Sequence, residues 1–174
     1  MIRFSPFKPA DAPILSEIGA TSLLESHGHS APPEIINKYV DVKFNPSNCR
    51  MELSDDRNIF YGVHHNDQAA GYFKIIPHVP NAAVDLEPVT KLERLYLLKA
   101  FYNLKLGEPL LQKCIELSKA HGDKGMWLNV WVENHRAIRF YEKHGFKIVG
   151  KAQFPLTENH SNPNWVMLLE YEQD

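Results

Sequence analysis

The sequence predicts an α/β fold in a single domain spanning residues 1–174, and three observations support this expectation. The chain has 174 residues, of which 44% are hydrophobic and 23% charged, a balance typical of a globular domain with its own core. Segments with the two-residue period of strands alternate with segments of helical period. Residues 93–132 follow the order strand, helix, strand, which predicts parallel or closely neighbouring strands in a mixed sheet.

The N-terminal third is expected to hold one strand followed by helices. Asp11 can cap the first helix with its carboxylate, and the prolines at 32–33 suit the first turn of the second helix. Residues 23–31 show no clear period and are expected to be irregular. The expected elements are a strand at 2–4, a helix after Asp11, a helix from 32 to 40 and a short helix after 45–46.

From residue 58 onward the pattern changes and strands dominate. Residues 59–63 and 69–76 alternate on either side of a turn at 65–67, which predicts an antiparallel hairpin, and a loop is expected at 77–88. The remaining expected elements are a strand at 92–97, a helix at about 107–122, a strand at 127–132, a helix at 134–144 and strands at 146–154 and 165–169.

Charge, cysteine content and hydropathy narrow the classes of function. With 19 basic and 21 acidic residues the net charge is −2, so neither nucleic acid nor a membrane surface is expected as a partner. Cys49 and Cys114 form no ligand cluster, so no metal is expected, and Cys114 suits a buried structural thiol. Without a signal-peptide pattern or a run of about 20 apolar residues, the expected location is the cytoplasm.

The most specific signal is the predicted helix at 134–144 with its flanking residues. Asn134 can cap the helix, and Gly145 can supply the left-handed residue that ends it. One stripe of side chains runs along the helix at positions i, i+3, i+4 and i+7, namely Ala137, Phe140, Tyr141 and His144. A capped amphipathic helix on a sheet explains much of this pattern, but not the whole string N-x-x-A-x-x-F-Y-x-K-x-G-F.

That string resembles the second acetyl-coenzyme A motif of the GCN5-related N-acetyltransferase (GNAT) superfamily. The other superfamily signature, Q/R-x-x-G-x-G/A, aligns with residues 102–107, where only Gly107 is kept. Over nearly the whole chain, the order of elements is similar to that of PaiA-type polyamine acetyltransferases. The resemblance implies a GNAT fold, with a mixed, mostly antiparallel central sheet flanked by helices. It also implies an enzyme that transfers an acetyl group from acetyl-CoA to a primary amine, either a small amine or a polyamine.

The resemblance further implies which residues hold the coenzyme. The strand at 95–97 would face the thioester, and Asn134 would bind the pantetheine arm. The turn before Gly107 would present backbone N–H groups to the pyrophosphate; Asn103 tolerates a left-handed conformation, and Lys105 adds a positive charge. The implied cofactor-binding residues are Leu95, Tyr96, Leu97, Tyr102, Asn103, Leu104, Lys105, Leu106, Gly107, Asn134 and Phe140.

Two residues are the catalytic candidates. Tyr141 matches the family's usual general acid, and a phenol with a pKa of about 10 suits protonation of a leaving thiolate. Glu93 is the candidate general base, acting directly or through water, with His27, His29 and His78 as alternatives. Because no residue has the setting of a covalent nucleophile, direct attack in a ternary complex is expected.

Two other functions stay open beside a small-amine acetyltransferase. The altered turn before Gly107 favours a non-catalytic sensor of acyl-CoA with the same fold. A protein or peptide N-acetyltransferase would instead use the segments at 26–28 and 77–88 as a groove. Asp85 and Glu87 would draw a cationic amine toward the site or form an ordinary solvated loop. The C-terminal strands are where a homodimer would form, but the sequence does not decide whether one does.

Overall fold

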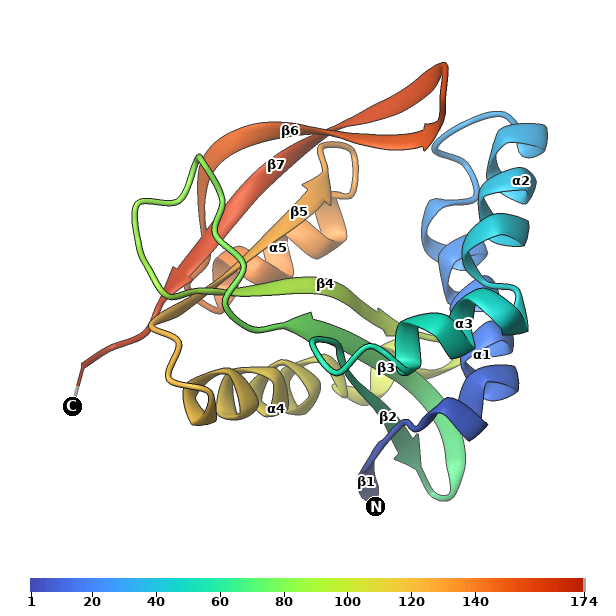
Figure 1. Ribbon diagram of the computed structural model, residues 1–174, viewed down its shortest axis with the longest axis horizontal. Helices are drawn as coiled ribbons and strands as arrows, with labels where there is room; N and C mark the ends of the chain where they lie inside the picture. The colour runs from blue at the N-terminus through green and yellow to red at the C-terminus, as the bar shows by residue number, and fades with distance from the viewer. Residues whose placement is uncertain (174) are drawn as a thin grey trace. The chain divides into compact units, whose positions relative to one another are not determined.

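The computed structural model describes residues 1–173. Within them the strands form a seven-stranded sheet with the hydrogen-bonded order β1-β2-β3-β4-β5-β7-β6 (Figure 1). The strands are β1 (Ile2–Pro6), β2 (Ile59–His65), β3 (Gln68–Ile76), β4 (Thr90–Leu97), β5 (Gly125–Trp131), β6 (Lys147–Thr157) and β7 (His160–Glu170). The α-helices are α1 (Ala12–His27), α2 (Pro33–Lys43), α3 (Pro46–Leu53), α4 (Gly107–Ala120) and α5 (His135–Lys143), with short 3-10 helices η1 (Pro9–Asp11) and η2 (Lys99–Leu104). The predicted α/β fold class is confirmed.

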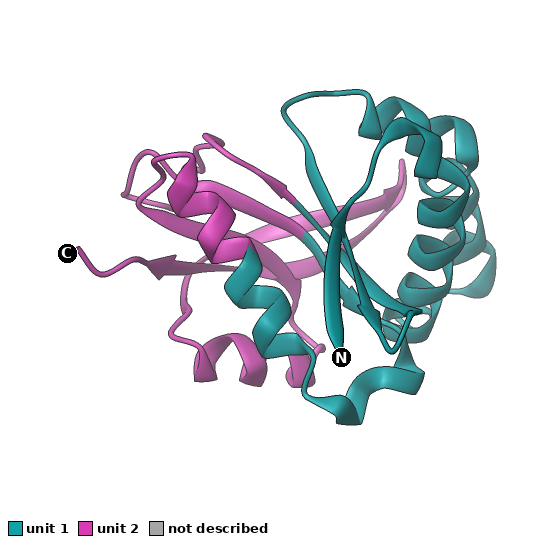
Figure 2. Ribbon diagram, turned by 90° about the horizontal axis from the view of Figure 1, so that it is seen from below, with its two compact units in different colours: residues 1–74, 94–113 teal, residues 75–93, 114–174 magenta. Residues whose placement is uncertain are grey.

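The chain divides into two compact units (Figure 2). The first comprises residues 1–74 and 94–113, and the second comprises residues 75–93 and the chain from residue 114 onward. In the first unit β1 pairs antiparallel with β2, and α1 packs on α3 around a core cluster. The buried members of this cluster are Ala12, Leu15, Ile18, Leu23, Phe44, Cys49, Phe60 and Tyr72.

Helix α1 corrects one expectation from the sequence. The helix continues to His27, so the prediction of an irregular segment at 23–31 is wrong for its first five positions, 23–27. Leu23 is 5% exposed and belongs to the core cluster, so burial of this side chain supports another helical turn. The Ser26 hydroxyl donates back to the Ser22 carbonyl at 2.8 Å, which keeps the polar residues of that turn inside the helix.

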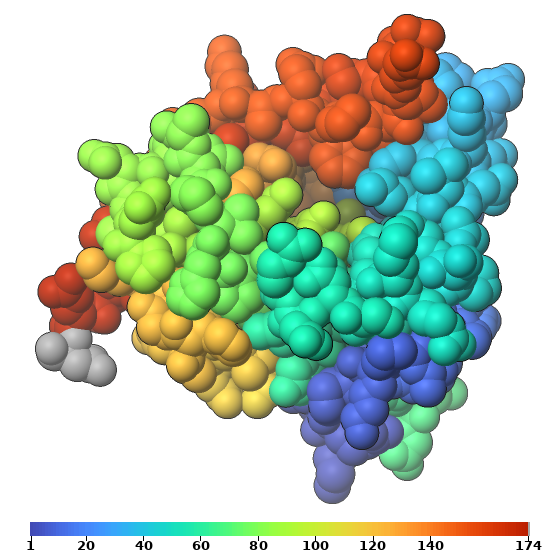
Figure 3. Space-filling model, viewed as in Figure 1, coloured from blue at the N-terminus to red at the C-terminus, as the bar shows by residue number. Residues whose placement is uncertain are grey.

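The strand–helix–strand order predicted from the sequence is present as β4, α4 and β5, and the starts of both strands belong to the second unit. Strand β4 pairs parallel with β5 through Thr90↔Met126 and Lys91↔Trp127, at the start of both strands. Strand β7 pairs antiparallel with both β5 and β6. The loop at 77–88, coloured light green at the surface in Figure 3, packs onto this sheet: Trp127 Nε1 donates to the Val79 carbonyl at 2.7 Å.

A buried polar network joins the start of β4 to the end of α4 in this unit. Thr90 Oγ1 lies 2.6 Å from Ser118 Oγ and donates to Asp123 Oδ2 at 2.6 Å. Asp123 Oδ1 lies 2.6 Å from Nδ1 of His78, a residue with φ of 60°. The Tyr171 hydroxyl donates to Ser118 Oγ at 2.8 Å, and burial raises the pKa of Tyr171. The buried Asp123 carboxylate thus accepts hydrogen bonds at Oδ2 and has His78 beside Oδ1, and the network is a structural clasp between β4 and α4.

Candidate active site

Helix α5 begins and ends as its sequence predicts. Asn134 Oδ1 accepts a hydrogen bond from the Ala137 amide at 3.3 Å, which confirms the predicted cap. Gly145 has φ of 95°, a left-handed conformation that suits glycine, and the Phe146 amide then donates to the Tyr141 carbonyl at 3.0 Å. The cap and the closing turn together fix where α5 starts and how it ends.

The phenol of Tyr141 stands in an aromatic setting. Its ring packs edge-on against Phe140 and Phe146, with centroid separations of 5.4 Å in both pairs. Phe146 is buried, while Tyr141 keeps 9% of its surface exposed. Such packing holds the ring in one orientation and leaves the hydroxyl end as its polar part. The setting suits a proton donor whose position matters, and packing is also what a core tyrosine would show.

The turn before α4 has a left-handed residue at Lys105, although it lacks most of the glycines of the signature. Helix η2 ends at Leu104, and Lys105 follows with φ of 56° and ψ of 36°, so a right-handed residue precedes a left-handed one. Successive residues of this kind form a concave nest of N–H groups that receives anions. The N-terminus of α4 begins at Gly107, directly after the nest.

The left-handed position in this turn is therefore Lys105, whereas Asn103, named from the sequence for that conformation, lies inside η2. Leu106 points into the protein interior with 1% of its surface exposed, and its carbonyl accepts from the Leu110 amide at 3.2 Å. Leu106 thus anchors the turn by packing, and only its backbone amide remains to meet a ligand.

The end of β4 packs against the end of α1 within the first unit. The rings of His27 and Tyr96 meet edge to face with centroids 6.0 Å apart. The ring centroid of Tyr72 also lies 6.0 Å from that of Tyr96. Ser26 Oγ lies 2.7 Å from His27 Nδ1. Burial, aided by the charge of His29, lowers the pKa of His27 to about 4, so the imidazole is neutral at pH 7. A base this weak is poorly suited to deprotonate an amine.

A largely buried ion triad joins α3, β3 and β4 and was missed from the sequence. Glu52 on α3 forms an ion pair with a residue from each of two strands. Its Oε2 lies 3.1 Å from Nζ of Lys74 on β3, and its Oε1 lies 3.1 Å from Nη2 of Arg94 on β4. Burial of Glu52 opposes its ionisation, but Arg94 and Lys74 outweigh this effect and hold the pKa of Glu52 below its ordinary value. The three residues are far apart in sequence and follow no motif, so only the fold brings them together.

The predicted site residues fall into two groups, each within one unit. Residues 95–97 and 102–107 belong to the first unit. Glu93, Asn134, Phe140 and Tyr141 belong to the second, with the last two on one helix and Asn134 as its cap. His78, an alternative base, is engaged with Asp123 at 2.6 Å in the structural clasp.

The described residues offer neither a metal site nor a reactive thiol setting. Between residues 1 and 173 no group of three or more His, Cys, Asp and Glu side chains is arranged to hold a metal ion. Cys49 and Cys114 are both buried, as expected for Cys114, and burial raises the pKa of each thiol. Over the same described stretch, no helix is long and apolar enough to cross a membrane.

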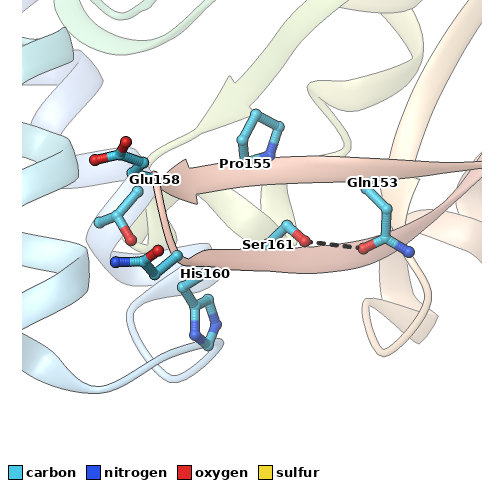
Figure 4. A pocket seen from close by; sticks show the side chains of 7 residues that line it. Gln153, Pro155, Glu158, His160 and Ser161 are labelled. Carbon is cyan, nitrogen blue, oxygen red and sulfur yellow. Dashed lines mark hydrogen bonds between the residues drawn. The ribbon is translucent and has the colours of Figure 1, made fainter.

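A hollow of about 450 Å³ lies at the tip of the β6–β7 hairpin (Figure 4). In this hollow Ser161 Oγ donates to Gln153 Oε1 at 3.1 Å, as the dashed line shows. The lining residues are Gln153, Pro155, Thr157, Glu158, Asn159, His160 and Ser161. None of them is a predicted site residue, and the hollow is not assigned to the active site.

Comparison with known proteins gives a consistent family. The acetyltransferase (GNAT) family model matches residues 21–146. An uncharacterized N-acetyltransferase of Mycobacterium tuberculosis is 30% identical over 160 residues, which cover 92% of this chain and 97% of the relative. The crystal structure of the PaiA N-acetyltransferase from Thermoplasma acidophilum in complex with coenzyme A has a TM-score of 0.78 at 21% identity, covering 98% of this chain and 99% of that one. The ribosomal-protein-S18-alanine N-acetyltransferase of Escherichia coli has a TM-score of 0.69 at 19% identity, covering 100% and 96%.

Because the family model spans well over half of the chain, the protein belongs to the GNAT acetyltransferase family. It is an N-acetyltransferase, and acetyl-CoA is its acyl donor.

Proposed function

We propose that the protein acetylates the primary amine of a small molecule or polyamine, by direct attack of the amine on acetyl-CoA within a ternary complex. The observation that carries the proposal is helix α5, with Asn134 as its cap and Tyr141 fixed between Phe140 and Phe146. This segment would supply the Asn134 amide for the coenzyme arm and a Tyr141 phenol held in a fixed orientation. No proposed step needs a metal ion or a covalent enzyme intermediate.

The chain's own residues would bind the coenzyme at two places. The amides of the turn at 105–107 and the start of α4 would donate to the pyrophosphate, with the Lys105 ammonium adding charge. Asn134 would donate from its side-chain nitrogen to the pantetheine arm, because its oxygen already caps α5. The backbone of residues 95–97 would align the thioester carbonyl.

Proton transfer would need an acid and a base. Tyr141 would give its phenolic proton to the sulfur as the carbon–sulfur bond breaks. Glu93, half-buried on β4, would remove a proton from the attacking amine, directly or through one water. The carboxylates of Asp85 and Glu87 would favour a cationic acceptor by their charge. The expected cytoplasmic location and a homodimer stay predictions.

The test is release of free thiol from acetyl-CoA by purified protein, measured with a panel of diamines, polyamines and monoamines. The expected result is amine-dependent thiol release, with acetylated amine of matching amount detected by mass spectrometry. Turnover of peptides but not of amines would select the protein N-acetyltransferase instead. Tight binding of acetyl-CoA with no acceptor turned over, and no effect of Tyr141→Phe, would contradict the enzyme and select the sensor.

A further inference from the structure

One buried polar atom of β5 faces no donor. Asn129 Oδ1 is shielded from solvent, and among residues 1–173 no hydrogen-bond partner lies within reach of it. Buried amide oxygens in proteins are almost always paired, because an unpaired one has lost its water without a replacement. The position is therefore explained most directly by a donor that does not belong to the chain.

The position of Asn129 along the chain suggests which molecule brings the donor. The residue lies near the C-terminal end of β5, and the chain continues from there through Asn134 into α5. Asn134 and Tyr141 are the residues that we propose for the coenzyme arm and the leaving thiolate. A ligand N–H group at Asn129 would thus belong either to the pantetheine amide or to the acceptor amine.

The pairing register of the sheet shows which face Asn129 is on, and this helps to choose between the pantetheine amide and the acceptor amine. Strand β5 pairs with β7 through Met126↔Leu169 and Asn129↔Val166, so Asn129 and Leu169 lie on opposite faces of this part of the sheet. Gly145, at the end of α5, lies against Leu169: a Cβ built on it would come within 3.2 Å of Leu169 Cδ1. Asn129 thus points away from the face that receives the end of α5.

We propose that Asn129 is a positioning residue whose side-chain oxygen accepts a hydrogen bond from an N–H group of the acceptor amine. This inference rests on the proposed function. An N–H···O bond leaves the nitrogen lone pair free to attack, so Asn129 would orient the nucleophile without consuming it. As the carbon–nitrogen bond forms and the carbon–sulfur bond breaks, the nitrogen gains positive charge and its N–H becomes a stronger donor. The proton then leaves to the base, and the thiolate takes one from Tyr141.

The test compares Asn129→Leu, which keeps the approximate volume and removes the acceptor oxygen, with Asn37→Leu, a control at an exposed position of α2. The expected result for Asn129→Leu is a rise of about tenfold or more in KM for the amine. Its dissociation constant for coenzyme A, measured by calorimetry, should stay within about twofold of the wild-type value. Its melting temperature should not fall, because an unpaired polar group is removed from the interior.

Two other outcomes for Asn129→Leu would contradict the proposal in whole or in part. An unchanged KM for the amine together with an unchanged affinity for coenzyme A would mean that neither ligand donates to the Asn129 oxygen and would overturn the inference. A weaker affinity for coenzyme A with an unchanged KM for the amine would identify the pantetheine amide as the donor and overturn the assignment to the amine. Asn129→Asp keeps an acceptor oxygen and should recover a lower KM than Asn129→Leu, which excludes a fold defect as the cause.

Failure of the proposed function would look different. In that case the wild-type protein itself would turn over no amine, whereas failure of the inference leaves wild-type turnover intact and Asn129→Leu unaffected. Calorimetric titration of amine into the coenzyme A complex needs no turnover. It therefore tests the role of Asn129 even for an acceptor that reacts slowly.

Discussion

At the scale of single residues, the surroundings of Tyr141 and of His27 suit these two side chains to different roles. Tyr141 is held by two aromatic neighbours, and this packing orients the hydroxyl for which we propose the role of general acid. His27 is the opposite case, since burial keeps its imidazole neutral and makes it a poor base although it contacts Tyr96. Titratable type alone does not identify a catalytic group; the environment of the residue does.

Replacing Tyr141 by phenylalanine should separate binding from chemistry. The ring and its packing remain, so the affinity for coenzyme A should be unchanged, while kcat should fall roughly 100-fold to 10,000-fold because the general acid is lost. Steady-state kinetics with calorimetry of coenzyme A would measure both quantities. A variant with wild-type kcat would mean that the phenol is a core aromatic and that the thiolate leaves without its help.

The lowered pKa of His27 predicts a loss of stability in mild acid. Below the ordinary value of 6.5 the unfolded chain takes up a proton that the folded state resists until about pH 4. The free energy of unfolding should therefore decrease as pH falls from about 6.5 to about 4. Urea titrations of His27→Phe, which keeps an aromatic ring beside Tyr96, should show a smaller decrease than wild type. Equal slopes in the two proteins would contradict the assignment, and His121→Phe at an exposed site is the control.

At the scale of elements, the sequence predicted those helix ends that depend on neighbouring residues, and it missed those that depend on packing. The cap at Asn134 and the left-handed Gly145 follow from side-chain chemistry and glycine's freedom, so both could be predicted. The left-handed Lys105 could not be predicted, because a lysine carries no preference for that conformation and the turn's shape depends on burial of Leu106. The last turn of α1 was missed for a similar reason, since packing of Leu23 outweighs an unclear local period.

The turn before α4 predicts opposite effects on stability and on binding for Lys105→Gly. Glycine adopts a φ of 56° without strain, so the free energy of unfolding should stay equal or rise by up to about 1 kcal/mol. The ammonium is lost, so the affinity for coenzyme A should fall several-fold and depend less on salt. Binding of pantetheine, which lacks the pyrophosphate, should not change. Equal losses for both ligands would mean that Lys105 does not lie at the phosphate site.

The ion triad of Glu52, Lys74 and Arg94 ties α3 to two strands and should matter most in acid. Because the folded pKa of Glu52 is depressed, its contribution to stability is present above the ordinary value of 4.5 and is lost as pH falls through the lower folded value. Glu52→Gln leaves two buried cations poorly compensated and should destabilise the protein by about 3–5 kcal/mol at pH 7. Its difference from wild type should shrink below about pH 4. A constant difference across pH, measured by urea titration, would contradict this account.

At the scale of the whole molecule, the sequence predicted the α/β class, parallel or closely neighbouring strands at β4 and β5, and the family; β4 and β5 are in fact parallel. The long motif around α5 made the prediction of the family possible, because a capped amphipathic helix alone does not explain the whole string. Contacts between distant segments, such as Glu52 with Arg94 or the Thr90–Ser118–Asp123 clasp, could not be predicted, because no local pattern encodes them.

The most direct measurement of the central claim is a crystal structure of the protein with coenzyme A bound. We expect hydrogen bonds from the amides of residues 105–107 and the start of α4 to the pyrophosphate. We also expect Asn134 on the pantetheine arm and the Tyr141 hydroxyl within hydrogen-bonding distance of the sulfur. Coenzyme A bound without contact to that turn, or with its sulfur out of reach of Tyr141, would contradict the roles proposed for these residues.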